Sequence, residues 1–192
     1  MEKMIKTCQV CQRAGNKPAS QRHTYWPLLA GSPLEILQID FIGSMPKSNR
    51  GNQYLFTVCC QFTRWLEAFP TKTATAKEAL NRLTEDFFPH YGIPTMIHSN
   101  RGTHFTANIF YVVCKKLSIS HSYSPAYHPE SNGIIERQHG TLKSMLKKLC
   151  NGKQEQWEIN LPSVLFAMRT SKNRTTGLLP FLLIFGRNPN TQ

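Results

Sequence analysis

The stretch Ile36–Ile42, with the sequence ILQIDFI, decides the fold class. Its β-branched and aromatic residues predict a strand that ends before Gly43 and Pro46. Asp40 interrupts this apolar run, and a carboxylate inside a strand is costly to desolvate unless it has a partner or a metal ion. We therefore predict either a metal ligand or an aspartate at a strand edge that is paired with a nearby Lys or Arg.

The segments on the C-terminal side of this strand extend it into a sheet. Residues 54–60 and 65–69 are further apolar runs with short connections, which favours an antiparallel meander. Apolar residues at helical spacing then follow between residues 76 and 87, after a capping threonine at Thr73 or Thr75. The remaining predicted elements are strands at 95–98 and 119–123 and helices at 105–117, 134–149 and 157–170, before a turn-like tail at 177–192. This order predicts an α/β domain with a mixed five-stranded sheet flanked by helices.

Composition limits the classes of function. The chain has 192 residues, 40% of them hydrophobic, which suits one domain with a core and at most a short appendage. No apolar run approaches the length of a membrane span, and we expect no membrane association. The formal net charge of +12 favours a nucleic-acid partner, although a merely basic protein has the same composition. Asp40 and Asp86 are the only aspartates, so any cluster of carboxylates must draw on few residues.

The six cysteines are expected to be reduced, because the chain shows no secretory signal. Cys59, Cys60 and Cys114 stand in apolar patterns and are predicted to be buried thiols. The pair Cys8 and Cys11 has a spacing that lets two thiolates bind one Zn²⁺, and forms half of a site whose other ligands would lie upstream. Two unliganded cysteines on a turn are the alternative; a redox pair is disfavoured, since no strand precedes them.

Several short motifs follow one another in order along nearly the whole chain. They are CQVCQR at 8–13, IDFIG at 39–43, WLEAFP at 65–70, YGIP at 91–94, SNRGTHF at 99–105, YHPESNG at 127–133, ER at 136–137, TLK at 141–143, TG at 176–177 and FGR at 185–187. With these motifs the chain resembles the integrase catalytic domain of long-terminal-repeat retroelements, in particular Ty3/gypsy-type elements and related endogenous retroviruses.

The resemblance implies an RNase H-like fold and an active site in which two aspartates and one glutamate bind two Mg²⁺ or Mn²⁺ ions. Such ions activate the nucleophile and stabilise the leaving oxygen in phosphodiester strand transfer. The first aspartate corresponds to Asp40 and the glutamate to Glu136, which has the family's spacing of thirty-five intervening residues from position 100. Taken without the resemblance, Glu136 has the alternative of a solvated helix residue.

Position 100 departs from the family pattern, because it is Asn100 where the second aspartate is expected. An amide oxygen can bind Mg²⁺ but brings no negative charge to the site. We therefore expect weakened metal binding at Asp40, Asn100 and Glu136, and a loss of roughly 10²–10⁴ in rate or more. His98, His104 and His128 flank the site loops and are weak candidates for metal ligands.

Contact with DNA is a separate expectation. Lys143 and Lys147 lie seven and eleven positions after Glu136, so a helix places all three on one face, where DNA phosphates would lie beside the metal site. Arg137 is a further candidate, and Lys115 and Lys116 are weaker ones. The alternative is a solvated lysine face of an amphipathic helix.

These expectations combine into one leading hypothesis. Residues 1–30 would be the remnant of a zinc-binding module and linker, and residues 31–192 a core-like domain that binds DNA as a dimer or higher oligomer in the nucleus, with catalysis lost or strongly impaired. It would derive from a transposable element, as a decayed copy or a host gene. The alternatives are an active polynucleotidyl transferase that tolerates Asn100, and a protein-interaction module without a DNA role.

Overall fold

The computed structural model describes residues 29–124 and 133–190. A five-stranded sheet has the strand order β3-β2-β1-β4-β5. The strands are β1 (Ile36–Ile42), β2 (Tyr54–Cys60), β3 (Leu66–Thr71), β4 (Met96–Ser99) and β5 (Ser120–Tyr123). The first three form the predicted antiparallel meander, and β4 and β5 run parallel to β1. The prediction of a mixed five-stranded sheet is confirmed.

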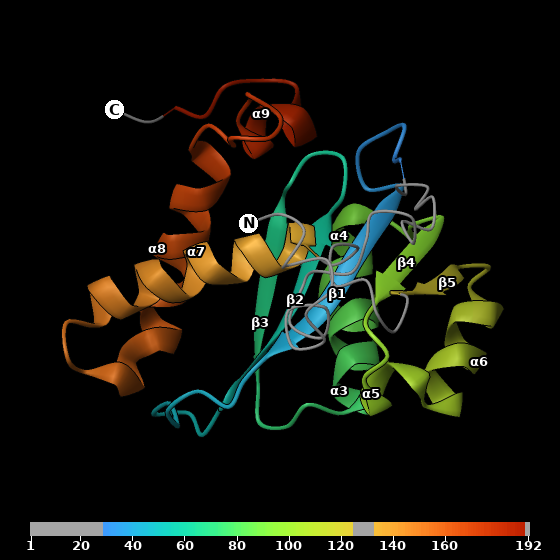
Figure 1. The fold of residues 1–192 in the computed structure, drawn as a ribbon, viewed down its shortest axis with the longest axis horizontal. Helices are drawn as coiled ribbons and strands as arrows, with labels where there is room; N and C mark the ends of the chain where they lie inside the picture. The colour runs from blue at the N-terminus through green and yellow to red at the C-terminus, as the bar shows by residue number, and fades with distance from the viewer. Residues whose placement is uncertain (1–28, 125–132, 191–192) are drawn as a thin grey trace, which may run out of the picture.

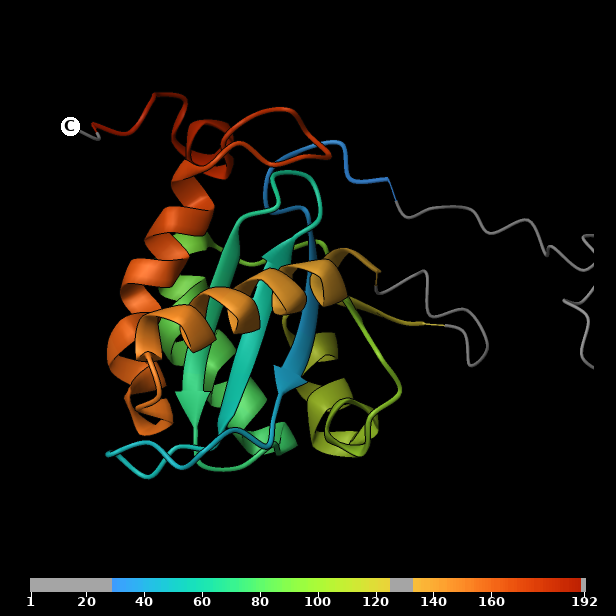
Figure 2. The same cartoon turned by 60° about the vertical axis from the view of Figure 1, so that its left-hand side comes forward.

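Helices cover both faces of this sheet (Figures 1 and 2). Those of the described residues are α3 (Ala76–Asn81), η2 (Arg82–Phe87, π-helical), α4 (Phe88–Tyr91), α5 (Thr103–Thr106), α6 (Asn108–Lys116), α7 (Gly133–Cys150), η4 (Gln154–Gln156, a 3-10 turn), α8 (Trp157–Thr170) and α9 (Pro180–Phe185). Thr75 caps α3, because its hydroxyl accepts from the Glu78 amide at 3.3 Å. Helix α7 crosses one face of the sheet, as both figures show.

Two apolar clusters hold the layers together. On one face, Leu37, Ile39 and Phe56 pack with residues of α3, η2, α5 and α6 such as Leu83 and Phe110. On the other face, the sheet residues pack against α7 and α8, including Leu142 and Trp157. The cysteines predicted to be buried thiols, Cys59, Cys60 and Cys114, are free and buried.

Two predicted elements need correction. The helix expected at 105–117 is split into α5 and α6, because Ala107 has an extended backbone with φ −62° and ψ 138°. The tail from 177 contains helix α9, which begins at Pro180 as its first residue and ends at Gly186 with a left-handed φ of 68°. No helix in the described ranges has the length and apolar character that crossing a membrane requires.

Candidate functional site

The parallel pairing of β1 and β4 brings the carboxyl ends of the two strands together. Ile39 is in register with Ser99, so Asp40 and Asn100 follow as neighbours at this end. The carboxyl ends of parallel strands are where α/β proteins bind ligands. Side chains alternate along a strand, and Asp40 therefore shares the α7 face of the sheet with Gln38 and Ile42. We call this place, with Asp40 and Asn100, the β1–β4 edge.

The side chains of Asn100 and Asp40 form a direct hydrogen bond. The Asn100 Nδ2 donates to Asp40 Oδ1 at 2.9 Å, and Asn100 Oδ1 accepts from the Gly102 amide at 2.8 Å. The Gly102 N–H can only donate, so it defines which end of the Asn100 side chain is the oxygen. The Phe41 amide also donates to Asp40 Oδ1, at 2.8 Å. The alternative of a Lys or Arg partner for Asp40 is wrong, since the side chain that donates to its carboxylate is an amide.

Burial dominates the electrostatics of Asp40. Burial raises its pKa from 3.8 to about 6, and the charge of Glu136 adds to the rise. The hydrogen bonds from Phe41 and Asn100 and the charge of Lys143 oppose it. A metal ion beside the carboxylate would have the same opposing effect with much more force. Burial therefore destabilises the charged form of Asp40 at neutral pH.

His139 and Thr57 form a layer beneath Asp40 that the sequence analysis missed. The Thr57 hydroxyl donates to the Asp40 carbonyl oxygen at 2.9 Å, so it accepts from His139 Nε2, which lies 2.8 Å away. This leaves His139 Nδ1 facing Asp40 Oδ2 at 4.0 Å. Burial lowers the pKa of His139 to about 4, assisted by the charge of Lys143, so this histidine is neutral at pH 7 and forms no ion pair with Asp40. The available signal was a histidine inside the apolar stripe of α7.

The other predicted residues lie on α7. Glu136, Arg137, Lys143 and Lys147 are all exposed. At about 100° per residue, Glu136, Lys143 and Lys147 share one flank of the helix, as predicted, whereas Arg137 lies roughly 80–120° away from these three. Their contact with DNA stays a prediction. Cys8, Cys11 and His128 lie outside the described residues.

The histidines near the edge have structural partners. His98 contacts the hydroxyls of Ser122 and Ser124 at 2.8 and 3.1 Å. His104 packs edge-on against Phe41 and Phe105, and burial lowers its pKa. The described residues contain no group of three or more His, Cys, Asp or Glu side chains placed to hold a metal ion. The donor set at the β1–β4 edge does not fit a two-metal centre, because Asn100 turns its N–H group, and not its oxygen, towards Asp40.

Comparisons with known proteins identify the family of the chain. A family model described as "Integrase core domain" matches residues 30–129, a range that includes Asp40 and Asn100 and ends before Glu136. The chain is 31% identical over 191 residues to the Gag-Pol polyprotein of woolly monkey sarcoma virus, which covers 98% of this chain and 11% of that protein. It is 30% identical over 152 residues to the retrovirus-related Pol polyprotein from transposon 412 of Drosophila melanogaster, covering 79% and 12%.

Solved structures share the fold. The simian T-cell lymphotropic virus intasome, in complex with the PP2A regulatory subunit B56 gamma, matches with a TM-score of 0.75 at 22% identity, over 100% of this chain and 69% of that chain. The HTLV-2 integrase catalytic core domain in complex with magnesium matches with a TM-score of 0.66 at 18% identity, over 81% and 99%. The chain spans about a tenth of the length of the polyproteins it matches. On its family match and its retroviral and retrotransposon relatives, the chain belongs to the integrase core domain family.

Proposed function

We propose that this protein is a retroelement-derived integrase core domain that contacts DNA and has lost most or all of its phosphodiester chemistry. The observation that carries the proposal is the hydrogen bond from Asn100 Nδ2 to Asp40 Oδ1. In an integrase-type reaction, carboxylates at these two positions would hold divalent ions that activate the attacking oxygen and stabilise the leaving one.

The charge at the β1–β4 edge supports loss of catalysis. Asp40 and Glu136 supply two carboxylates where the family pattern has three, and hard divalent cations depend on such charge. The amide at position 100 also satisfies Asp40 from within the protein, so an ion must displace a made hydrogen bond as well as bind with less charge. The consequence is weak binding of Mg²⁺ or Mn²⁺.

Strand-transfer and disintegration assays with Mn²⁺ test this part of the proposal. Asn100→Asp should raise the rate by roughly 10²–10⁴ over the unaltered chain, because it restores the third carboxylate. Asn108→Asp is the matched control, since it adds the same charge at an exposed position on α6. Robust metal-dependent activity in the unaltered chain would mean that the protein is an active transferase that tolerates Asn100.

The DNA contact is proposed for the flank of α7 that carries Lys143 and Lys147. Both side chains are exposed, and the charge of Lys143 is felt by Asp40 and His139. Each phosphate contact contributes about −0.9 to the slope of log K against log salt. Replacing both lysines with glutamine should therefore weaken duplex binding and flatten the slope by about two, with Lys115→Gln/Lys116→Gln as the comparison. An unchanged slope would show that this flank of α7 does not contact DNA.

Self-association and a nuclear location complete the proposal. Ile109, Tyr111 and Val112 on α6 and Phe166 on α8 are large apolar side chains at least 40% exposed, which favours an interface with a second copy. The HTLV-2 integrase core has been solved in a dimeric and a trimeric form. Sedimentation of the unaltered chain and of Phe166→Glu measures the oligomeric state: the substitution should shift a dimer to monomer.

A DNA-contacting domain would act in the nucleus, which imaging of a tagged chain tests.

A further inference from the structure

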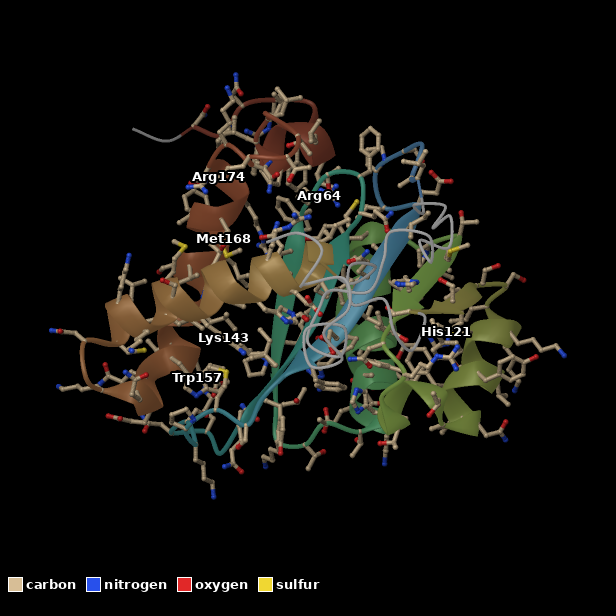
Figure 3. The ribbon with its side chains drawn as sticks, in the orientation of Figure 1. Arg64, His121, Lys143, Trp157, Met168 and Arg174 are labelled. Carbon is tan, nitrogen blue, oxygen red and sulfur yellow. The ribbon has the colours of Figure 1, made fainter. Side chains whose placement is uncertain are left out.

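A cavity of about 540 Å³ lies between α7 and the C-terminal end of α8 with the segment that follows it. We call it the basic pocket, and define it by Arg64, Arg137, Gln138, Thr141, Lys172 and Arg174 among its lining residues. Figure 3 shows Arg64, Met168 and Arg174 on one side of α7 and Lys143 on the other. The lining contains neither Lys143 and Lys147 of the proposed DNA contact nor Asp40 and Asn100 of the β1–β4 edge.

The helical spacing of α7 explains this separation. Arg137, Gln138 and Thr141 lie within about 100° of one another around the helix axis, whereas Lys143 lies roughly 120° or more from each of them. The pocket is thus a second charged surface on the same helix.

Arg64 makes the pocket electrostatically incomplete. Its Nε and Nη1 are buried and have no hydrogen-bond partner in the part of the chain that the structure describes. Its backbone carbonyl accepts from Gln138 Nε2 at 3.4 Å, which attaches the turn carrying Arg64 to α7. Burial lowers the pKa of Arg64, and the nearby charge of Arg137 lowers it as well. A buried guanidinium without an acceptor is costly, so a nearby anion would offset an uncompensated charge.

The protein supplies no anion to this pocket from its lining. The lining residues within the described ranges include four cationic side chains and no Asp or Glu. Glu67 on the adjacent strand β3 is already occupied, because its Oε2 lies 2.6 Å from Arg169 Nη2. Two neighbouring guanidinium groups with an amide and a hydroxyl beside them match the oxygens of a phosphate group, which arginine binds in a bidentate manner.

We propose that the basic pocket binds a phosphate group of a polyanion, either a backbone phosphate of nucleic acid or a free polyphosphate. The anion would accept from the exposed guanidinium groups of Arg137 and Arg174 and would offset the repulsion between Arg64 and Arg137. The pocket volume accommodates one to a few phosphate groups, but not a duplex. This inference stands on the pocket itself and does not depend on the function proposed for the Lys143 flank.

Calorimetric titration of the full chain with inorganic pyrophosphate at low ionic strength tests the proposal. We expect saturable binding that Arg174→Gln and Arg137→Gln each weaken about tenfold, the usual effect of losing one charged hydrogen bond. The side chains of Arg137 and Arg174 are exposed, so neither substitution should disturb the folding of the domain. Lys77→Gln removes one positive charge at an exposed position on α3, across the sheet from α7, and should change the affinity less than about twofold.

A second arm distinguishes the two sources of phosphate and uses a labelled DNA duplex. If Arg174→Gln weakens DNA binding and pyrophosphate displaces the duplex, the occupant is a nucleic-acid phosphate; if only pyrophosphate binding changes, it is a free polyphosphate. The proposal is overturned if the pocket variants affect neither ligand, or if Lys77→Gln weakens pyrophosphate binding as much as Arg174→Gln. Failure of the Lys143/Lys147 variant to affect DNA would contradict the proposed function and leave the pocket standing.

Discussion

The β1–β4 edge and the basic pocket treat buried charge in opposite ways. At the edge, the Asp40 carboxylate accepts hydrogen bonds from the Asn100 side chain and from the Phe41 backbone amide, so its partners are supplied by the protein. In the pocket, Arg64 keeps its charge and leaves two nitrogens without a partner among the described residues. Both groups have a pKa shifted by burial towards the neutral form.

This difference indicates which of the two sites would gain more free energy from binding a ligand. A site that is completed internally gains little from a ligand, because the ligand must replace hydrogen bonds already made. A site with unpaired donors gains the full value of a new acceptor. The edge inherited from an integrase is thus the less ligand-dependent of the two, and the pocket the more.

The largest predicted effect comes from reopening the edge. Asn100→Asp removes the donor to Asp40 and places a second carboxylate about 3 Å away, where like charges repel strongly. In EDTA at pH 8 the free energy of unfolding should fall by about 3 kcal/mol. Mn²⁺ should restore it in the variant and leave the unaltered chain unchanged, as measured by denaturant unfolding.

Asn108→Asp controls for the added charge at an exposed site. If Mn²⁺ stabilises the unaltered chain as much as the variant, Asn100 does not weaken metal binding at the β1–β4 edge. The contrast between the two regions would then be wrong.

The next effect concerns the cost of the Asp40 charge. Its pKa is about 6 in the folded protein against 3.8, so the native state binds the extra proton between these values and loses stability as pH rises from about 4 to 6. A shift of this size corresponds to about 3 kcal/mol. Asp40→Asn should therefore stabilise the protein by up to about 3 kcal/mol at pH 8 and by nearly nothing at pH 4. Unfolding by urea across this pH range measures the difference.

His139 and His121 set the background of that titration. Burial lowers the pKa of each to about 4, so both destabilise the native state as pH falls from 6.5 to 4, in the opposite direction to Asp40. The difference between the unaltered chain and Asp40→Asn isolates the aspartate, since both proteins carry the histidines. A difference that does not depend on pH would show that Asp40 is not buried at a cost.

Local patterns predicted the sheet side of the edge well. The run Ile36–Ile42 forms β1 with the predicted bounds, because its alternation and closing residues are local properties. The pairing of Asp40 with Asn100 is different in kind. The residues are 60 positions apart, and only the parallel register of β1 with β4 makes them neighbours. The family resemblance pointed to both positions, while the hydrogen bond between them needed the structure.

The pocket shows what the sequence could not reveal. Arg64 lies on a turn, Arg137 on α7 and Arg174 beyond α8, and no motif links the three. Arg137 was predicted as a further candidate for DNA contact, and it lines the pocket, about 120° around α7 from Lys143. Helical phase alone separates the two residues, so this separation was available from the sequence, but the facing residues from α8 and the turn were not.

A third prediction removes the carboxylate charge that compensates Arg169. Arg169 pairs with Glu67 and lies over the Trp65 ring at 4.4 Å, and Glu67 also accepts from Tyr91 at 2.7 Å. Glu67→Gln removes the partner charge at a site where the two side chains are only 13% and 19% exposed, and should cost about 2 kcal/mol. Arg50→Gln breaks an ion pair whose arginine is 81% exposed, and should change stability within about 0.5 kcal/mol. Equal losses from both variants would contradict the reasoning.

The smallest predicted effect tests the pocket from the side of stability. Arg64→Met keeps the length of the side chain and removes the buried donors that lack a partner, so in anion-free buffer it should raise the free energy of unfolding by about 1 kcal/mol. Saturating pyrophosphate should remove this advantage, because the protein with Arg64 binds the anion more tightly and gains more stability from it. Arg174→Met, at an exposed position, should gain less from pyrophosphate than the unaltered chain, without a change in anion-free buffer. A loss of stability in Arg64→Met in anion-free buffer would mean that the protein itself stabilises the Arg64 guanidinium. The buried charges of the edge and of the pocket would then both be compensated from within the protein.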